Sequence, residues 1–538
     1  MVASSIPHYP LLTSGETDPV WVHLDPPYNR PAFPTLENDV ETDVCIIGAG
    51  VAGISLAYEL VSCGVNVLLV EAREVLSGET GRTSGHLSNA LDDRYTEIAK
   101  KLGQPEARLA AESHTWAINR VEEIAKALRI SCEFRRLPAY AISQYPRGHP
   151  KRDGEVEDLK IEAATARDCG LSSIYEEGYV IKGWDGKHDQ RGVTIFSDQA
   201  TFHPTLYFNG VLRWLKQQEN FSCVTHTKIT QIEEEGMGVL SMGHRQVKVQ
   251  SEDGHTIKCN HAVEATCVPL QKSNVIAEME YFRTYCIAIR VPKGKVEDCL
   301  LYDSADKYKY LRITDCDAKD DYLIVGGCDH KVGQDEPTGR FGELERWARE
   351  RFTKTGTVDY RWSGQIFEPS DCMAFIGKNP LTKRTYLVTG DSGNGLTHGV
   401  IAGKLIADEI RGISNRWAKL YAPSRVESIF KSAATMMIPN IENDEESKRF
   451  VESDIRDIED LPFGSGGVLN RDTDKPIAVY KDDHGRVHRY SAFCPHMQDV
   501  VCWNRVEKSW DCPAHGSRFS KDGLCVMGPS KSKLEEFS

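Results

Sequence analysis

The stretch that decides the fold is residues 43–71, which read DVCIIGAGVAGISLAYELVSCGVNVLLVE. An apolar run leads into a loop with glycines at Gly48, Gly50 and Gly53, an apolar-periodic segment follows, and a second apolar run ends in Glu71. This order predicts a strand, a tight turn, a helix, a second strand and an acid. Together these elements are typical of a βαβ unit that binds a dinucleotide.

Each part of this unit has a physical task. Gly48 permits the tight turn, Gly50 lets the backbone approach a pyrophosphate, and Gly53 lets the helix lie close to the strand. Free N–H groups at the start of the helix favour phosphates. Glu71 stands about 20 residues beyond the first glycine, where a ribose-binding acid belongs. The stretch does not distinguish NAD from FAD, and an ordinary βαβ unit with a glycine turn is the alternative.

Composition and charge narrow the class of protein. At about 100–200 residues per domain, a chain of 538 residues, 40% hydrophobic and 27% charged, is typical of a globular protein with several domains. A net charge of −14 argues against a large nucleic-acid surface and for small-molecule chemistry. The 16 cysteines are mostly scattered singly, which favours a reducing compartment over a disulfide framework. Without a signal-peptide pattern or a transmembrane run, we expect a cytoplasmic protein.

A second glycine-rich loop follows the opening unit. Residues 77–86 read SGETGRTSGH, and so many small residues indicate a backbone that passes close to a ligand. Arg82 is a candidate partner of a phosphate, and His86 is a candidate to face a ring system. For His86, a hydrogen-bonded structural histidine is the alternative.

A third glycine-rich loop lies far along the chain. Residues 385–398, TYLVTGDSGNGLTH, predict a strand and a loop, with a helix following over 400–410. The helix start near Asn394 to Thr397 can direct N–H groups at an anion. Glycine loops at the two ends of one domain suit an elongated cofactor with two poles, and a simple strand-to-helix turn is the alternative.

The region between these loops predicts helices over residues 91–135 and then a second sheet. Alternating or apolar runs indicate mostly antiparallel strands, at 281–291, 308–314 and 321–327. A sheet inserted into a dinucleotide fold usually shapes a substrate site. Arg283 and Arg312 lie in these strands, and Arg312 is a candidate to hold a carboxylate, with a sheet-surface position as the alternative.

The last part of the chain carries a candidate metal centre in a β-rich segment with glycine turns. Cys494 and His496 form one loop, CPH, and Cys512 and His515 form another, CPAH. Tetrahedral zinc can use two Cys and two His. A Rieske-type [2Fe–2S] cluster uses the same set differently, with two Cys on one iron and two His on the other. Because each loop mixes one Cys with one His, the sequence favours iron, with zinc as the alternative.

Two family resemblances rest on these motifs. Residues 38–425 resemble the FAD-dependent amine and amino-acid oxidoreductases of the D-amino-acid oxidase type, and the tail resembles a Rieske domain. The matching segments are GAGVAG at 48–53, EA at 71–72, TGRTSGH at 80–86, WSGQ at 362–365, GDSGNGLT at 390–397, the two ligand loops, and GSRF at 516–519. The resemblance implies an α/β FAD-binding Rossmann-type domain with an inserted mixed or antiparallel-sheet substrate domain, and then a small all-β Rieske domain.

The expected organisation has four parts: an N-terminal extension over 1–40, the oxidoreductase domain over 41–437, an acidic linker over 438–461 and the Rieske domain over 462–538. Within the oxidoreductase domain, FAD-binding parts are expected at about 41–90, 190–270 and 370–412, and substrate parts at about 91–189 and 275–365.

The resemblance also implies the cofactors, FAD and a [2Fe–2S] cluster, and the residues that hold them. The expected FAD contacts are Gly48, Gly50, Gly53, Glu71, Thr80, Arg82, His86, Asn394, Gly395, Leu396 and Thr397. The expected cluster ligands are Cys494, His496, Cys512 and His515. No residue is assigned as a catalytic base.

Many Rieske domains link their two ligand loops by a disulfide. The corresponding positions here are Asp499 and Ala514, so that bridge is absent, as in lower-potential, oxygenase-type clusters. Ser517 is a candidate hydrogen-bond donor to a sulfur, which would raise the potential, so the direction stays open.

The function implied is oxidation of a small amine, an amino acid or a related C–H donor by hydride transfer to FAD. Single electrons would then pass to the cluster and on to an external acceptor, a protein or O₂. An NAD(P)H-driven reductase is less supported, because no second GxGxxG motif occurs. The alternatives are an O₂-using flavin oxidase with an accessory cluster and a non-catalytic, redox-sensing protein.

Overall fold

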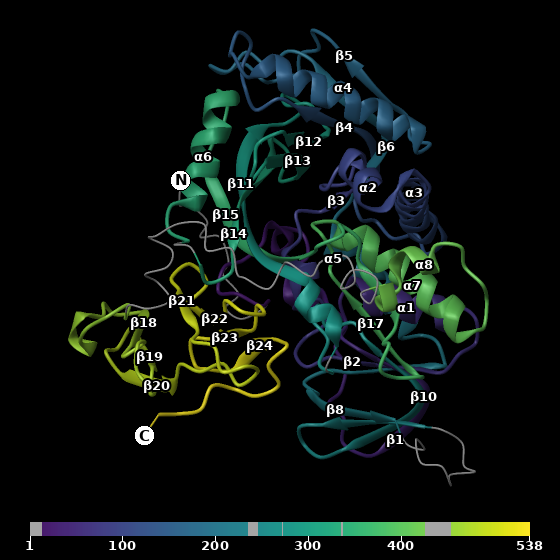
Figure 1. Cartoon of the computed structure of the whole chain (residues 1–538), viewed down its shortest axis with the longest axis vertical. Coiled ribbons are helices and arrows are strands. Elements are labelled where there is room, and N and C mark those ends of the chain that lie inside the picture. Colours follow the sequence, from purple (N-terminus) through teal and green to yellow (C-terminus); the bar gives the residue numbers. More distant parts are fainter. Residues whose placement is uncertain (1–12, 235–245, 272, 335–336, 426–452, 538) are drawn as a thin grey trace.

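The computed structural model describes residues 13–234, 246–271, 273–334, 337–425 and 453–537. Figure 1 shows three lobes: an upper one built on a nine-stranded sheet, a lower right one built on an eight-stranded sheet, and a small C-terminal one in yellow. The expected acidic linker over 438–461 lies largely outside the described residues.

The eight-stranded sheet carries the opening glycine motif. Its strands run in the order β16-β17-β10-β1-β2-β7, with β9 also on β10 and β8 on β9. The strands from β17 to β7 are parallel, as βαβ connections require. They are β1 (Val40–Ile47), β2 (Val67–Val70), β7 (Phe221–Val224), β8 (Ile229–Glu234), β9 (Val247–Ser251), β10 (Thr256–Glu264), β16 (Phe375–Lys378) and β17 (Thr385–Thr389).

Helices pack against this sheet and bring two helix starts together. They include α1 (Val51–Val61), α3 (Gln104–Ala127), α5 (Pro204–Leu215), α7 (Gly395–Ile410) and α8 (Ala418–Tyr421). A Cβ on Gly399 would lie 2.6 Å from the Val51 side chain, and one on Gly403 would lie 2.9 Å from the backbone of Ser55. These two glycines of α7 therefore let α7 and α1 pack closely side by side.

The nine-stranded sheet runs β15-β11-β14-β13-β12-β4-β6-β3, with β5 paired to β6. Only the β12–β4 pairing is parallel among the described strands, so the sheet is mixed and mostly antiparallel. The strands are β3 (His86–Leu87), β4 (Arg135–Ile142), β5 (Ser173–Glu176), β6 (Val193–Thr201), β11 (Met279–Pro292), β12 (Leu300–Asp303), β13 (Lys309–Asp315), β14 (Asp320–Lys331) and β15 (Val358–Pro369). The accompanying helices are α2 (Tyr95–Leu102), α4 (Arg152–Asp168) and α6 (Arg340–Arg351).

The C-terminal lobe consists of two small antiparallel sheets around a core that contains Trp503, Trp510 and Phe519. The first sheet is β18 (Ser465–Leu469), β19 (Ile477–Lys481) and β20 (Val487–Ser491), and the second is β21 (Cys502–Asn504), β22 (Ser509–Asp511), β23 (Arg518–Ser520) and β24 (Cys525–Met527). In Figure 1 this lobe lies beside the β14 and β15 strands of the larger body.

Short 3₁₀ helices connect these elements, at η1 (Val20–His23), η2 (Pro27–Asn29), η3 (Glu79–Arg82), η4 (Asn274–Glu278), η5 (Pro423–Arg425) and η6 (Ile458–Asp460). The described part of the N-terminal extension packs on the core through η1. Trp21 is buried, donates its indole N–H to the carbonyl of Thr83 at 2.8 Å, and lies against the guanidinium of Arg312.

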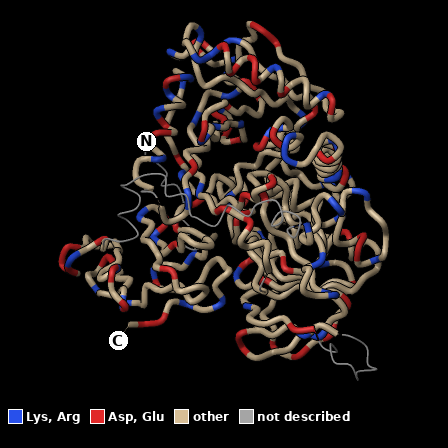
Figure 2. Tube along the Cα trace, in the orientation of Figure 1, with Lys and Arg blue, Asp and Glu red and all other residues tan. Residues whose placement is uncertain are grey.

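The described residues contain no helix long and apolar enough to cross a membrane. Figure 2 shows acidic and basic residues interspersed over all three lobes of the described part of the chain.

Candidate functional site

The first glycine loop has the geometry that a bound dinucleotide needs. Gly48 adopts φ +107°, and a Cβ there would lie 2.3 Å from the carbonyl oxygen of Ala265. A Cβ on Gly53 would lie 1.9 Å from the Gly48 carbonyl oxygen, so this glycine lets α1 approach β1. On Gly50, the nearest atom to such a Cβ is the Thr80 hydroxyl at 3.0 Å. The outer side of Gly50 is thus free for a ligand.

Two side chains accept hydrogen bonds from the backbone of this loop and of the start of α1. Gly50 is the N-cap and provides no side-chain cap, while the N–H of Val51 donates to the hydroxyl of Thr80 at 2.9 Å. The Glu71 carboxylate accepts from the N–H groups of Ala49 and Arg73. Its predicted contact with a ribose stays a prediction.

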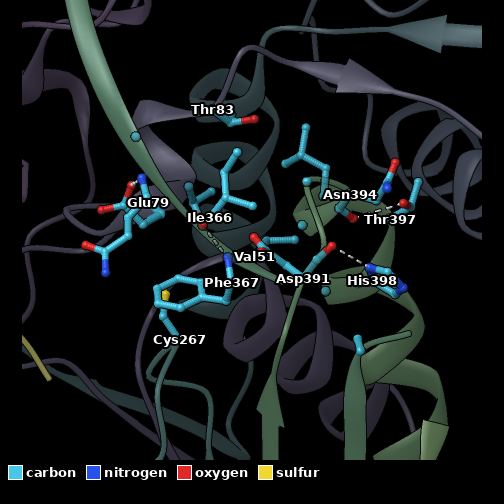
Figure 3. Close-up of a pocket in the computed structure, with 18 of the residues that line it drawn as sticks. Val51, Glu79, Thr83, Cys267, Ile366, Phe367, Asp391, Asn394, Thr397 and His398 are labelled. Carbon is cyan, nitrogen blue, oxygen red and sulfur yellow. Dashed lines mark hydrogen bonds between the residues drawn. The ribbon is translucent and has the colours of Figure 1, made fainter. Parts of the chain in front are cut away.

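A single pocket joins this loop to the loop after β17 (Figure 3). Asn394 is the N-cap of α7 and provides no side-chain cap, so N–H groups in the first turn of α7 are left to a ligand. The pocket runs from the Gly50 end to the Asn394 end, as an elongated cofactor requires. Gly48, Gly53 and Glu71 are not in the lining of this pocket. The other eight of the eleven predicted FAD contacts line it: Gly50, Thr80, Arg82, His86, Asn394, Gly395, Leu396 and Thr397.

His86 lies at the pocket as a neutral ring. Its two ring nitrogens lie 3.0 Å from the Ser84 hydroxyl and 3.2 Å from the Leu311 carbonyl oxygen. Burial, with the nearby Arg312 charge, lowers the pKa of His86 to about 3. The His86 ring also packs against Tyr302 and Tyr310. His86 is therefore a hydrogen-bonded, packed histidine that also forms part of the pocket wall.

The structure gives Arg82 a different set of partners from the phosphate expected. Its Nε donates to the Ser363 carbonyl, Nη1 donates to the Thr13 hydroxyl and the Thr17 carbonyl, and Nη2 donates to the Thr17 hydroxyl and the Glu507 carboxylate. All five N–H donors are therefore used within the protein. This arrangement ties the oxidoreductase part to the C-terminal lobe and leaves a phosphate contact unsupported.

The two arginines of the second sheet are also buried and engaged. Arg283 forms an ion pair with Asp511 of the C-terminal lobe at 2.7 Å. Arg312 donates to the carbonyls of Gly85 and Phe202. The sheet-surface position considered for Arg312 is wrong, because its side chain is fully buried.

The four predicted metal ligands fall into two pairs. Cys494 and Cys512 are buried, and the His496 and His515 rings lie with centroids 5.1 Å apart. The Nδ1 atoms of both histidines are buried and have no hydrogen-bond partner, as expected for atoms that ligate a metal. Two buried thiols and two imidazoles with unpartnered Nδ1 atoms are the donor set that a Rieske-type [2Fe–2S] cluster uses, so these residues fit that group.

The surroundings of the pairs agree with the absence of a bridging disulfide. All 16 cysteines lie in the described residues and are free of disulfides. The Ser517 hydroxyl lies within hydrogen-bonding reach of Cys494 and accepts from the N–H of Ser530, which leaves its proton for the sulfur.

The cluster loops contact the wall of the pocket directly. Gln365 lines the pocket, and its amide nitrogen donates to the Gly516 carbonyl at 2.9 Å. The Tyr281 ring lies edge-on to His515, with centroids 6.1 Å apart, and to Phe367 of the pocket wall, with centroids 5.9 Å apart. Neither contact was predicted from the sequence, where Gln365 stood only within the WSGQ motif at 362–365.

A two-ended pocket on a dinucleotide fold, beside paired Cys and His ligands, defines a flavin- and iron–sulfur-containing oxidoreductase. The chain belongs to the FAD dependent oxidoreductase family, whose model matches residues 43–409, and residues 454–538 match the Rieske [2Fe-2S] domain. The predicted fold class, the two cofactors and the oxidoreductase activity are thereby confirmed.

Relatives support the same class. YhfW of Bacillus subtilis (strain 168), whose name describes a Rieske 2Fe-2S iron-sulfur protein, is 26% identical over 94% of this chain and 95% of its own. Gamma-glutamylputrescine oxidoreductase of Escherichia coli (strain K12) is 25% identical over 72% of this chain and 87% of its own.

Solved structures share the fold of the oxidoreductase part. Glycine oxidase from Geobacillus kaustophilus matches with a TM-score of 0.57 at 15% identity, over 72% of this chain and 99% of its own. L-proline dehydrogenase from P. horikoshii matches with a TM-score of 0.56 at 16% identity, over 72% of this chain and 99% of its own.

Proposed function

We propose that this protein oxidises a small amine, an amino acid or a related C–H donor and passes the electrons through its cluster to an external acceptor. When bound, FAD accepts a hydride and the [2Fe–2S] cluster carries single electrons, so together they join two-electron to one-electron chemistry. The names of similar proteins support the substrate class, since they refer to gamma-glutamylputrescine, glycine and L-proline.

The helix starts beside the pocket suit the binding of such a cofactor. The first turns of α1 and α7 both border the pocket and lack side-chain caps at Gly50 and Asn394. Their N–H groups and helix dipoles would favour negative charge on a cofactor bound between them.

The observation that carries the proposal is the short path from the pocket wall to the cluster loop. Gln365 reaches the backbone next to His515, and Tyr281 fills the space between His515 and Phe367. One layer of side chains therefore separates the pocket from a cluster ligand. This proximity favours exchange of electrons between the two cofactors.

An anaerobic screen of amines and amino acids against the purified holoprotein tests the proposal. We expect an active compound to bleach the flavin absorbance and then to produce the EPR signal of the reduced cluster. Cys512→Ser, which removes a cluster ligand, should keep flavin bleaching and lose the EPR signal and electron transfer to a one-electron acceptor such as ferricenium. Cys525→Ser, the same substitution at a thiol that is not a ligand, is the matched control.

The alternatives give different results in the same assays. Rapid peroxide formation that Cys512→Ser leaves unchanged would favour an O₂-using oxidase. A flavin that no amine, amino acid or imine bleaches would favour the redox-sensing protein and remove the amine-oxidoreductase proposal.

A further inference from the structure

One end of the pocket has a chemistry that distinguishes among the substrates proposed. Tyr302 of β12 and Tyr308 and Tyr310 near β13 line this end, together with Asp92. The hydroxyl of Tyr308 donates to the Asp92 carboxylate at 2.6 Å. Aromatic rings around a carboxylate form a setting that attracts cations.

Further buried carboxylates lie behind this wall. Asp329 of β14 is 8% exposed, and its Oδ1 is buried without a hydrogen-bond partner. Its other contact is with Thr284, which lines the pocket. Burial raises the pKa values of these groups, to about 7 for Asp92, 6 for Asp329 and 8 for Glu368. Neighbouring carboxylates add to the rise at Asp92 and Glu368, whereas Lys309, Lys307 and Arg340 oppose it at Asp329. A cationic ligand beside Asp92 would favour the charged form of this carboxylate.

The described lining of the pocket offers no free cationic side chain to a substrate carboxylate. Among the lining residues that the structure describes, Arg82 is the one Arg or Lys, and its five donors are all used within the protein. Burial lowers the pKa of His86 to about 3 and that of His398 to about 4, so both rings are neutral. Lys309, the nearest lysine on β13, pairs with Glu343 at 3.0 Å. A carboxylate here would be left without a charged partner, next to Asp92.

We propose that the substrate is an amine that enters as a cation, is held by Asp92 among Tyr302, Tyr308 and Tyr310, and carries no carboxylate on its reacting carbon. This inference rests on the proposed function and narrows it. The balanced reaction is R–CH₂–NH₃⁺ → R–CH=NH₂⁺ + H⁻ + H⁺, with the hydride going to FAD and the proton to solvent. Water then converts the iminium to R–CHO and NH₄⁺.

Matched pairs of compounds that differ by one carboxylate test this inference on the anaerobic FAD-loaded protein. The pairs are n-butylamine with norvaline, 1,4-diaminobutane with ornithine, and benzylamine with phenylglycine, in both enantiomers. Binding is read from the perturbation of the flavin spectrum, and turnover from flavin bleaching. We expect at least one amine to bind and bleach, with a Kd at least about tenfold below that of its amino acid.

Asp92→Asn tests the role of the carboxylate. It should raise the Kd of the amine about tenfold or more, because a charge-assisted contact is lost. Asp306→Asn, which removes an exposed negative charge close to β13, is the control and should leave the Kd unchanged. Circular dichroism and thermal unfolding check that both variants fold.

The outcomes separate this inference from the proposed function. If amino acids bleach the flavin as well as their amines or better, or if Asp92→Asn leaves the amine Kd unchanged, the inference is overturned and the oxidoreductase function stands. If no compound of either class binds or bleaches, both fall. Preference for an amine, weakened by Asp92→Asn, supports both.

Discussion

Gly48, Gly50 and Gly53 have different surroundings in the folded chain, although they share one short motif. Gly48 has a left-handed backbone conformation and lies close to the Ala265 carbonyl. Gly50 faces the pocket, and Gly53 lies close to the Gly48 carbonyl. A side chain is excluded at two of these positions by the protein itself. At Gly50, which lines the pocket, a Cβ would lie 3.0 Å from the Thr80 hydroxyl.

The close contact at Gly53 predicts that a larger residue there destabilises the protein. Gly53→Ala places a Cβ within 1.9 Å of the Gly48 carbonyl oxygen, so α1 must move away from β1. We expect a loss of stability of about 1–3 kcal/mol, with a lower FAD content. Thermal unfolding and the ratio of flavin to protein absorbance measure both.

Gly154 provides the control, because it is an exposed helical glycine of α4 with no atom within 4 Å of the added Cβ. Gly154→Ala should be neutral or stabilise the protein by up to about 1 kcal/mol. Equal effects of the two substitutions would contradict the packing argument.

At the scale of elements, β11 and β15 connect the two redox sites. These neighbouring antiparallel strands place Tyr281, Arg283 and Gln365 along one face against the C-terminal lobe. Because strand residues alternate between faces, residues two apart share a face. The same strands contribute Thr284 and Ile366 from the other face to the pocket lining, which also includes Gln365 and Phe367.

Removing the polar contacts of Gln365 should slow electron transfer from the flavin to the cluster. Gln365→Leu keeps the volume but loses the donation to Gly516 and the contact with Arg518. We expect slower appearance of the reduced-cluster EPR signal after flavin bleaching, with the bleaching itself retained. Rapid-freeze EPR and anaerobic stopped flow measure the two steps.

Gln231→Leu changes an exposed glutamine of β8 in the same way and is the matched control. Unchanged cluster reduction in Gln365→Leu would show that this contact is not on the route.

At the scale of the whole molecule, buried charges hold the C-terminal lobe on the oxidoreductase part. Arg82 pairs with Glu507, and Asp511 lies between Arg283 and Arg518. The N-terminal segment joins this contact, since Thr17 donates to Glu507 and Arg518 donates to the carbonyl of Ser14. Buried ion pairs fix geometry but make the loss of either partner costly.

Glu507→Gln should therefore destabilise the protein strongly. It leaves the buried Arg82 guanidinium without its counter-charge, at a cost of about 3–5 kcal/mol. Chemical denaturation followed by tryptophan fluorescence measures the change. Glu536→Gln, at an exposed pair with Lys533, should cost at most about 1 kcal/mol.

The same carboxylate gives a prediction for acid stability. Burial opposes ionisation of Glu507, but the charges of Arg82 and Arg518 outweigh it and lower its pKa from 4.5 to about 2. The stabilisation is fully present above pH 4.5 and is lost as the pH falls toward 2. Denaturation between these values should show this loss, and Glu507→Gln should lose less stability over the same interval.

Features of this protein that depend on local pattern could be predicted from the sequence. The run from Val44 to Ile47 became the buried end of β1, and the segment after Gly50 became α1, because periodicity and glycine placement act within a few residues. The paired loops at Cys494 and Cys512 indicated the cluster for the same reason, since ligand spacing is local. The partner of Arg82 could not be predicted in this way, because Glu507 lies 425 residues away in the sequence.

By itself, the sequence determined the fold class and the two cofactors, because glycine turns, helix starts and ligand loops each depend on a few neighbouring residues. Only the tertiary structure decided what the buried charges do. It paired Arg82 with Glu507 and Arg283 with Asp511, left Asp92 facing the pocket, and brought Tyr281 to His515. The physical reason is that a buried charge takes its partner from whatever packing brings near, and packing joins strands that are distant in sequence.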